Sequence, residues 1–458
     1  MTPSQRKLHS LSLALICSGW IFPQNAAANI GESFGFGSRA AALASAVTAE
    51  AQKQDGYASF YNPALMPFGS ETFTLSWGVI AMEPRFKPIE NVVLANTYMA
   101  EATQIGSVDL NYRTTFGNFF GLTWRSESSA KWAAGLTAFL PLLQTAFMDT
   151  GEAFAPEYTL DRARTQRPQF NFAAARILLP NFSVGAGLQV AFSMTAKADI
   201  SLQTDLAKPS NMRFTTSLAP KAVPYLGMLY APEGKQGISG GLTLRFPSTS
   251  EAHMDLTSAV NLPATGSYFP FAYNSQSALY YDPLTIQLGA KLPWSAEQQT
   301  FLQLEHQAWR NFKTPVMTLT RDPQGAILSD SRNPEYEYRN ILVPRVGHEA
   351  SFGGTLVRLG YGYRPSILAR LSTGAGNRID PSRHMLQTGL GWEFRECFGT
   401  KTLCDLDLHA AYQHLARQHI DKTPADEAGS PTGNKVGSPG YDVGGKIYGG
   451  GVSLTLKI

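Results

Sequence analysis

The C-terminal stretch KIYGGGVSLTLKI, residues 446–458, ends in a strict alternation of apolar and polar side chains. The apolar residues Val452, Leu454 and Leu456 are each separated by one polar residue. Successive side chains of a β-strand point to opposite faces, so a period of two predicts a strand with one apolar and one polar face. The same alternation recurs in LTIQLGAKL (284–292), LVRLGYGY (356–363) and CDLDLHAAYQ (404–413).

Extended to the whole chain, this periodicity predicts fourteen strands after residue 70. They span residues 71–82, 105–125, 131–147, 166–179, 182–206, 211–231, 236–256, 283–293, 299–312, 339–350, 355–365, 383–396, 403–415 and 446–458. Most contain at least about ten residues, which is the length that a tilted strand needs to cross the hydrocarbon layer of a membrane. The alternation alone fits either a soluble sandwich or a membrane barrel.

The connections between the predicted strands separate these two classes of fold. Connections after even-numbered strands are short, as in SESSA (126–130), whereas most connections after odd-numbered strands are long, as in residues 313–338 and 416–445. A bacterial outer-membrane barrel has short periplasmic turns and long extracellular loops, and an even number of antiparallel strands. The sequence therefore predicts an all-β, 14-stranded antiparallel outer-membrane barrel, with residues 71–458 forming its wall.

Composition agrees with a membrane barrel and excludes a nucleic-acid-binding protein. Charged residues make up 16% of the chain, aromatic residues 11%, and the net charge is only +3. An average soluble domain has about 25% charged residues. Binding to nucleic acid requires a basic face, and no basic cluster is present in this sequence, so we expect no such partner.

The N-terminus matches a secretory signal peptide, residues 1–28. Arg6 and Lys7 precede an apolar run over 11–22, and the small residues 26–28 supply a cleavage site after Ala28. The next stretch, GFGSRAAALASAV (35–47), fits the glycine spacing of a dinucleotide-binding loop. That loop requires a strand directly upstream, and the signal peptide leaves no room for one, so we reject the nucleotide-binding interpretation.

Residues 29–70 lack the alternation of the strands and form a separate N-terminal segment. The small residues from Arg39 to Ala51 predict a short helix, which Gly56 and Pro63 would end. At the periplasmic end of a barrel, such a segment either hangs free or folds into the lumen as a plug. Phe34, Phe36, Phe60 and Tyr61 favour burial in the lumen.

Residues 35–68, GFGSRAAALASAVTAEAQKQDGYASFYNPALMPF, resemble the N-terminal hatch of the long-chain fatty acid transporter (FadL) family. Members of that family carry a Gly-rich start, here Gly35 and Gly37, and an Asn-Pro-Ala motif before the first strand, here Asn62, Pro63 and Ala64. The segments LEHQAWRNF (304–312), NILVPRVGHEASF (340–352), LVRLGYGYRPS (356–366) and NRIDPSRHMLQTGLGWEF (377–394) resemble the second half of the family.

This resemblance implies a barrel blocked by a hatch at residues 29–70, which takes up hydrophobic molecules such as long-chain fatty acids or hydrocarbons. Ligand would leave through a lateral opening at a kink in the third strand, where Pro141 is the candidate because proline lacks an N–H for the ladder. Proline at a misplaced strand end is the alternative. The chain departs from the family in ending at Ile458 and in lacking the acidic pair before the hatch motif.

A place in the bacterial outer membrane implies specific surroundings for a chain of this kind. We expect a monomer that contacts outer-membrane lipid and lipopolysaccharide and is inserted by the barrel-assembly machinery. The alternative is a barrel of the same type that does not transport and serves as an adhesin or as a partner in secretion. The tryptophans lie in or beside predicted strands, as an interface girdle requires, with core packing as the alternative: Trp77, Trp124, Trp132, Trp294, Trp309 and Trp392.

Candidate chemistry in the barrel is sparse. Cys397 and Cys404 flank a turn and predict a local disulfide in an oxidising compartment, with two unpaired thiols as the alternative. His409 and His414 are five residues apart, which puts them on opposite faces of a strand, and no G-x-S-x-G or H-E-x-x-H motif occurs, so we expect no enzyme, metal or cofactor. Charged residues on predicted lumen-facing positions would contact a ligand carboxylate or shape a water path, with solvation or pairing across a polar lumen as the alternative: Lys291, Glu305, Arg358, Asp405 and Asp407.

Overall fold

The structure is a computed structural model of the chain. The residues that it describes are 34–95, 104–108, 112, 114–126, 131–143, 157–158, 160–161, 168–203, 211–232, 237–262, 267–312, 316–318, 320–321, 326–327, 337–369, 378–397, 399, 402–422, 437 and 439–458. The predicted signal peptide lies outside these residues.

Within the described residues, fourteen strands pair antiparallel in a closed ring, as the alternation predicts. The ring closes where β1 pairs with β23, from Thr74 opposite Lys457 to Phe86 opposite Gly445. The strands of the ring are β1 (Phe73–Phe86), β4 (Thr115–Arg125), β5 (Trp132–Pro141), β7 (Gln169–Leu179), β8 (Phe182–Gln203), β9 (Asn211–Tyr230), β10 (Ser239–Arg245), β13 (Thr285–Pro293), β14 (Gln298–Gln307), β18 (Ile341–Phe352), β19 (Thr355–Arg364), β21 (Arg383–Phe394), β22 (Leu403–Asp421) and β23 (Gly440–Lys457).

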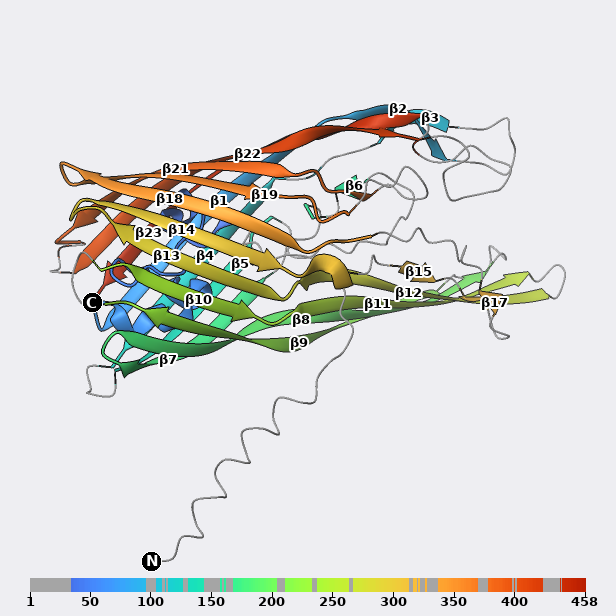
Figure 1. The fold of residues 1–458 in the computed structure, drawn as a ribbon. Coiled ribbons are helices and arrows are strands. Elements are labelled where there is room, and N and C mark those ends of the chain that lie inside the picture. Colours follow the sequence, from blue (N-terminus) through green and yellow to red (C-terminus); the bar gives the residue numbers. More distant parts are fainter. Residues whose placement is uncertain are drawn as a thin grey trace, which may run out of the picture.

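The two ends of the barrel differ, and Figure 1 shows this difference plainly. At one end the strands are joined by short connections, such as residues 180–181 between β7 and β8 and residues 353–354 between β18 and β19. We call this the short-turn end, and we call the opposite end, where the long connections gather, the loop end. The segment before β1 lies inside the barrel near the short-turn end, where the C-terminus also lies (Figure 1).

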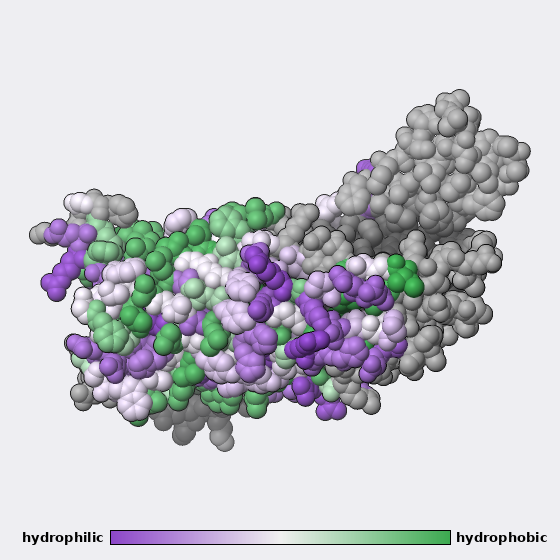
Figure 2. Space-filling model, turned by 90° about the horizontal axis from the view of Figure 1, so that it is seen from above, coloured by the Kyte–Doolittle hydropathy of each residue, from purple (hydrophilic) through white to green (hydrophobic). Residues whose placement is uncertain are grey.

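The wall turns its apolar side outward. In β21, Leu386 and Leu390 are 51% and 40% exposed, whereas Gln387 between them is buried. In β19, Leu359 is 60% exposed, while its neighbour Arg358 is buried. This arrangement reverses that of a soluble sandwich and is typical of a membrane barrel with a polar lumen. Figure 2 shows apolar and hydrophilic patches together on one face of the wall, with hydrophilic residues gathering toward the loop end.

Several predicted strand boundaries were wrong near the loop end, and two of the predicted strands are divided there. The strand predicted over 236–256 ends at Arg245. Beyond the ring, β11 (Ser248–Leu262) and β12 (Ser267–Asp282) pair antiparallel, and β11 also pairs in parallel with the end of β8. Pro247 lies at the break and has no N–H for the ladder. The strand predicted over 105–125 is divided in the same way, because β3 (Gln104–Val108) pairs with β2 (Ile89–Ala95) and not within the ring.

Shorter elements complete the described part of the loop end. They are β6 (Glu157–Tyr158), η3 (Trp309–Asn311), β15 (Val316–Thr318), β16 (Thr320–Arg321), β17 (Ala326–Ile327) and β20 (Arg378–Ile379). β6 and β20 pair in parallel. No described helix combines the length and the apolar character needed to cross a membrane.

The tryptophans divide between the two roles considered for them. Trp77, Trp124, Trp132 and Trp294 are 44–67% exposed and lie near the short-turn end of the wall, as an interface girdle requires. Trp309 is fully buried in an apolar cluster at the loop end, so for this residue core packing is the correct interpretation.

Candidate functional site: the hatch and its contacts in the lumen

The hatch is a compact segment of short helical turns, and nearly all of its side chains between residues 34 and 67 are buried. It contains α2 (Ser38–Ala42), α3 (Ala58–Tyr61) and η1 (Pro63–Phe68). The helix predicted from Arg39 to Ala51 was too long. α2 ends at Ala42 because the chain then turns through Ala44 and Ser45, whose φ angles are 54° and 61°, a left-handed conformation that a helix cannot continue.

The two glycines of the predicted hatch motif are needed where they lie. Gly35 and Gly37 have φ angles of 87° and 77°. A Cβ atom on Gly37 would lie 2.4 Å from the Tyr57 ring, and one on Gly35 would lie 2.9 Å from the Ala41 backbone. Both the backbone conformation and the close packing therefore require glycine, and the spacing serves packing within the hatch.

Asn62 of the Asn-Pro-Ala motif joins the hatch to itself and to the wall. Its Oδ1 accepts a hydrogen bond from the Ala64 N–H at 3.0 Å and so caps η1, and Pro63 occupies the first position of that helix. Its Nδ2 donates to the carbonyl oxygens of Thr48 in the hatch and Met228 in β9, both at 3.0 Å. Every polar atom of this buried amide side chain thus has a partner.

Glycines on the lumen side of the strands let the hatch backbone approach the wall. A Cβ atom on Gly241 in β10 would lie 2.2 Å from the Thr48 carbonyl oxygen, and one on Gly227 in β9 would lie 2.1 Å from Asn62 Oδ1. Any larger residue at these positions would displace the hatch. The wall glycines in close contact with the hatch are Gly121, Gly135, Gly185, Gly227, Gly241, Gly289, Gly347, Gly360 and Gly389.

Buried charges tie the first half of the hatch to β13, β18, β19 and β22. Arg39 contacts Glu50 of the hatch and Glu349 of β18, each at 3.1 Å. Glu349 also contacts Arg358 at 2.6 Å, Arg358 contacts Asp407 at 2.6 Å, and Lys291 contacts Glu50 at 3.0 Å. The ionic cluster consists of the cations Arg39, Lys291 and Arg358 and the anions Glu50, Glu349 and Asp407.

The ionic cluster keeps its hatch members charged. Burial opposes ionisation of Glu50, but Arg39 and Lys291 outweigh that effect and hold the pKa of Glu50 below its ordinary value. Burial likewise acts to lower the pKa of Arg39, but Glu349 and Glu50 outweigh it and raise that pKa. Since the members alternate in sign and balance in number, each buried charge has an opposite charge as a neighbour.

Aromatic packing and hydrogen bonds hold the second half of the hatch. The Phe36 ring lies 4.2 Å from that of Phe60 and 5.0 Å from that of Phe119 in β4, measured between centroids. The Tyr61 hydroxyl accepts from the Phe36 N–H at 2.6 Å and donates to the Phe36 carbonyl at 3.0 Å. The Tyr225 hydroxyl of β9 donates to the Ser59 carbonyl at 2.7 Å. This half therefore presents an apolar, aromatic surface to the lumen wall.

Arg245 is a buried cation that the sequence patterns did not reveal. It ends β10, donates to the Phe60 carbonyl oxygen, and lies over the rings of Phe60 and Tyr225 at 4.4 and 4.9 Å. Among the described residues it has no carboxylate partner, and its Nε and Nη1 atoms have no acceptor. Its inward place on β10 is the signal that would have identified it.

A second cluster of buried apolar residues lies at the loop end. It joins Trp309 and Phe312 to Ile341 of β18, to Met385 of β21 and to Ile367, which follows β19. Ion pairs flank it within the described residues, between Arg364 and Asp380 and between Arg383 and Asp161, both at 3.0 Å.

The predicted lumen-facing charges all point inward. Four of the five are buried, and Asp405 is partly exposed and pairs with Lys457 at 2.5 Å. Lys291, Arg358 and Asp407 belong to the ionic cluster, and Glu305 pairs with Arg345 at 3.6 Å. Each of the five therefore pairs with an opposite charge in the structure, and Arg358 and Asp407 pair with each other.

The remaining predicted site residues lie apart from the hatch. Pro141 is the last residue of β5, opposite Gly117 of β4, and the pairing of β5 with β7 runs unbroken from Trp132 to Phe139. The ladder of β5 is thus continuous up to Pro141 with β4 and up to Phe139 with β7, and a lateral opening at Pro141 stays a prediction. Cys397 and Cys404 are joined as a disulfide, with Cα atoms 6.3 Å apart.

Histidines and acids do not assemble a metal site in the described part of the chain. No group of three or more His, Cys, Asp or Glu side chains there could hold an ion. His409 is buried and faces the lumen, whereas His414 is exposed on the outer face. The prediction that these two histidines lie on opposite faces of their strand is confirmed.

Comparison with known proteins shows similarity of fold without similarity of sequence. No protein-family model and no curated protein sequence matches the chain. A Pseudomonas aeruginosa FadL homologue has 14% identity and a TM-score of 0.54, over 96% of this chain and 99% of the other. The CymD monoaromatic hydrocarbon channel has 13% identity and a TM-score of 0.53, over 92% and 97%.

A third structure agrees with these two. The toluene transporter TodX of Pseudomonas putida has 12% identity and a TM-score of 0.52, over 93% of this chain and 99% of the other. All three alignments span nearly the whole of both chains, and none of the three proteins is named as an enzyme. The chain therefore has the fold of the FadL-type channels, as the resemblance of its hatch segment predicts.

Proposed function

We propose that the protein is a bacterial outer-membrane channel through which hydrophobic molecules diffuse, with the hatch controlling their passage. The observation that carries this proposal is the aromatic-rich hatch packed inside a closed barrel whose outer wall is apolar. Similar folds in proteins named as a hydrocarbon channel and a toluene transporter support it. The short-turn end would then face the periplasm and the loop end the exterior.

The channel would act by replacing water with apolar surface along the path of the ligand. A hydrophobic molecule crosses the polar outer surface of the membrane poorly, and transfer from water to an apolar site is favourable. The apolar cluster at the loop end and the aromatic surface around Phe36 and Phe60 would supply two such sites. Movement down a concentration gradient through these sites needs no chemical change in the ligand.

Passage beyond the aromatic surface would require the hatch to move or the wall to open. α2 contacts β19 and β21–β23, and η1 contacts β4, β5 and β7–β9, so the hatch touches the wall on opposite sides. A lateral exit beside Pro141 is the second route that we propose, since the ladder between β5 and β7 ends at Phe139, two residues before this proline.

Arg245 would decide which hydrophobic ligands are held most firmly. A buried guanidinium with two donor atoms free of acceptors favours a carboxylate, which accepts hydrogen bonds from the guanidinium fork. The Phe60 and Tyr225 rings on either side would contact the chain of an amphipathic acid. We therefore propose that Arg245 contacts the carboxylate of a long-chain acid, whereas an aromatic hydrocarbon gains nothing from it.

Uptake measurements test the proposed function. Labelled oleate and labelled toluene are supplied to cells with and without the protein, after heat-modifiability on gels has shown that the barrel is assembled. We expect faster uptake of both with the protein present. Arg245→Gln should slow oleate uptake and leave toluene uptake unchanged, and Arg176→Gln, which alters an exposed arginine on the outer wall, should change neither.

The alternative function predicts a different result. An adhesin or secretion scaffold with the same barrel would leave both uptake rates equal in cells with and without the assembled protein. That outcome would exclude transport of these ligands. Equal loss of oleate and toluene uptake in the Arg245→Gln variant would retain the channel but exclude a carboxylate contact.

A further inference from the structure

Register places a row of basic side chains on the outer wall near the loop end. Arg85 of β1 lies directly opposite Lys446 of β23, Lys446 opposite His414 of β22, and His414 opposite His384 of β21. All four side chains are exposed and face outward. We call these four residues the basic row.

The basic row lacks enough acidic partners on the protein. Like charges directly opposite each other on one face of a sheet repel, and Arg85 and Lys446 are such a pair. Glu83 pairs with Arg85 at 3.0 Å, but Lys446 has no ion pair or hydrogen bond within the described residues. Asp442, the next acid toward the loop end, already contacts Lys87 and Arg417.

Tyrosines line the wall one step closer to the short-turn end. Tyr448 lies opposite Tyr412, Tyr412 opposite Leu386, and Leu386 opposite Tyr361. The Arg85 guanidinium lies 5.6 Å from the centre of the Tyr448 ring, so the two rows touch. Tyrosines on an outer wall mark the level at which hydrocarbon meets headgroups. The basic row therefore lies at headgroup level.

The next outward-facing residues along the strands have unusually small side chains and leave a groove. Ala81 lies opposite Gly450, Gly450 opposite Ala410, and Ala410 opposite Thr388. Two residues further along each strand the outward side chains are bulky again, with Val452 opposite Leu408 and Leu408 opposite Leu390. An apolar groove of about 720 Å³ lies on the outer face between the line of tyrosines and the line that runs from Ala410 through Thr388 to Leu359.

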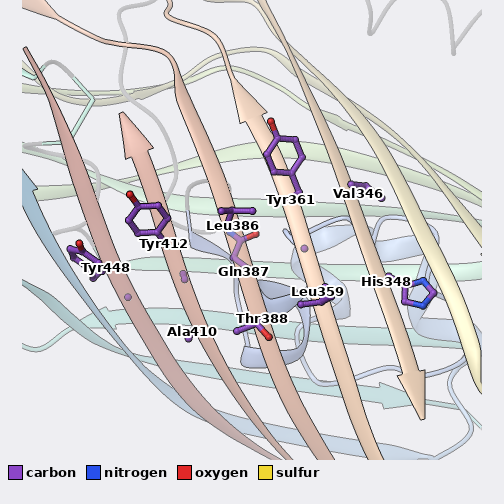
Figure 3. Close-up of a pocket in the computed structure, with 13 residues that line it drawn as sticks. Val346, His348, Leu359, Tyr361, Leu386, Gln387, Thr388, Ala410, Tyr412 and Tyr448 are labelled. Atoms are coloured by element: carbon purple, nitrogen blue, oxygen red, sulfur yellow. The ribbon is translucent and has the colours of Figure 1, made fainter. Parts of the chain in front are cut away.

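Figure 3 shows both sides of this groove. Tyr448, Tyr412, Leu386 and Tyr361 stand along one side. The short side chains of Ala410 and Thr388 lie on the other side, followed by Leu359. Because strands in such barrels tilt by about 35–45°, a groove that crosses them runs obliquely from headgroup level toward the membrane interior.

We infer that this part of the wall binds a phosphorylated glycolipid of the outer leaflet, the lipid A moiety of lipopolysaccharide. The basic row would contact its phosphates, the tyrosines its polar boundary, and the groove one of its acyl chains. The inference rests on the proposed outer-membrane placement, in which the loop end faces outward, and it does not depend on transport. Charge complementarity and continuity with the lipid-facing wall favour this lipid over a protein partner.

Binding of purified, detergent-solubilised full-length protein to lipid A tests the headgroup contact. Native mass spectrometry would compare bis-phosphorylated lipid A, its dephosphorylated form and phosphatidylethanolamine. The double variant Arg85→Gln/Lys446→Gln should bind phosphorylated lipid A about 30-fold more weakly, because each basic residue near an anionic lipid contributes roughly fivefold. Arg176→Gln, an exposed arginine at the other end of the wall, is the matched control and should bind as the unaltered protein does.

A second variant tests the groove separately. Ala410→Phe fills the strip of small side chains and should weaken binding of phosphorylated lipid A, whereas Ala134→Phe, at an exposed outward position on β5, should not. Equal binding of the phosphorylated and dephosphorylated lipids by the unaltered protein would overturn the inference. So would full binding by the double variant. Oleate uptake is measured in parallel, so that loss of lipid binding with normal uptake leaves the proposed function intact.

Discussion

The two halves of the hatch are held in the lumen by different forces. Residues 38–55 are fixed to the wall mainly by the ionic cluster around Arg39 and Glu349. Residues 57–68 are fixed mainly by aromatic packing and by Asn62, while wall glycines approach both halves closely. The ionic half depends on protonation, while the apolar half depends on shape, so one half can loosen while the other remains seated.

This difference has a consequence for gating. A buried ion pair loses stability sharply when one partner is removed or neutralised, because the other charge is left unpaired. Packed aromatic rings respond instead to changes in volume. If the hatch moves during passage of a ligand, we expect the ionic half to move first and the aromatic half to act as the hinge.

Removal of both halves gives the largest expected effect. Deletion of residues 29–66 takes away the whole packed segment that fills the lumen near the short-turn end. We expect a large rise in single-channel conductance in planar bilayers, from a blocked to an open pore. The barrel should still assemble, as heat-modifiability on gels would show, because ring closure between β1 and β23 does not involve the hatch. An unchanged conductance would show that the hatch does not block the pore.

Disruption of the ionic half alone should have the next largest effect. Glu349→Ala leaves Arg39 and Arg358 without their shared carboxylate and should destabilise docking of the first half by about 3–5 kcal/mol. Hydrogen exchange followed by mass spectrometry should show faster exchange in residues 38–55 than in 57–68. Glu393→Ala removes the exposed pair with Lys53 and should change docking by at most about 1 kcal/mol. Equal loosening of both halves would contradict independent anchoring.

Alteration of the apolar half at Asn62 should have a smaller effect. Asn62→Ala removes the cap of η1 and leaves the Thr48 and Met228 carbonyls without their donor, at a cost of about 2–3 kcal/mol. Faster exchange should then appear in residues 57–68. Asn62→Asp keeps the capping oxygen but not the donor, so it separates the two contributions. If residues 57–68 exchanged as slowly in the Asn62→Asp variant as in the unaltered protein, the cap of η1 alone would account for the effect of Asn62.

The wall of the barrel could be predicted from the sequence, and the reason is physical. A side-chain period of two, repeated in segments such as 446–458, predicts strands with one apolar and one polar face. The connection lengths then indicate whether the apolar face contacts lipid or a protein core. The errors lie where the alternation continues past the ring, as at Pro247, because pattern alone does not tell a wall strand from a protruding one.

The sequence predicts which segment enters the lumen, but it does not predict the contacts that this segment makes there. The resemblance at Gly35, Gly37 and the Asn-Pro-Ala motif predicts a plug in this segment. The wall partners of Arg39 and Glu50 lie on strands more than 200 residues away, at separations of 310 and 241 residues. Such pairings depend on the order of the strands around the ring, and a single sequence does not reveal which lumen-facing charges meet. The same holds for Arg245, whose lack of a carboxylate partner appears only when its neighbours are known.

The smallest expected effect is a pH dependence that acts on the ionic half. Asp55 lies half-buried between the halves, accepts a hydrogen bond from the Tyr57 N–H at 3.0 Å, and has Arg39, Asp407 and Lys457 as charged neighbours. Burial raises the pKa of Asp55 to about 6, above its ordinary value near 4. Because the docked hatch favours the protonated form, docking should weaken as pH rises from about 4 to 6 and stay weaker above that range.

Hydrogen exchange of residues 38–55 at pH 5 and pH 7.5, corrected for the intrinsic effect of pH on exchange, measures this dependence. We expect slower corrected exchange at pH 5. Asp55→Asn keeps an uncharged side chain of the same size and should remove the difference between the two pH values, with exchange resembling that of the unaltered protein at pH 5. If the variant retained the full pH dependence, another group would have to be its source, and Asp55 would not be the residue through which acidity seats the ionic half more firmly.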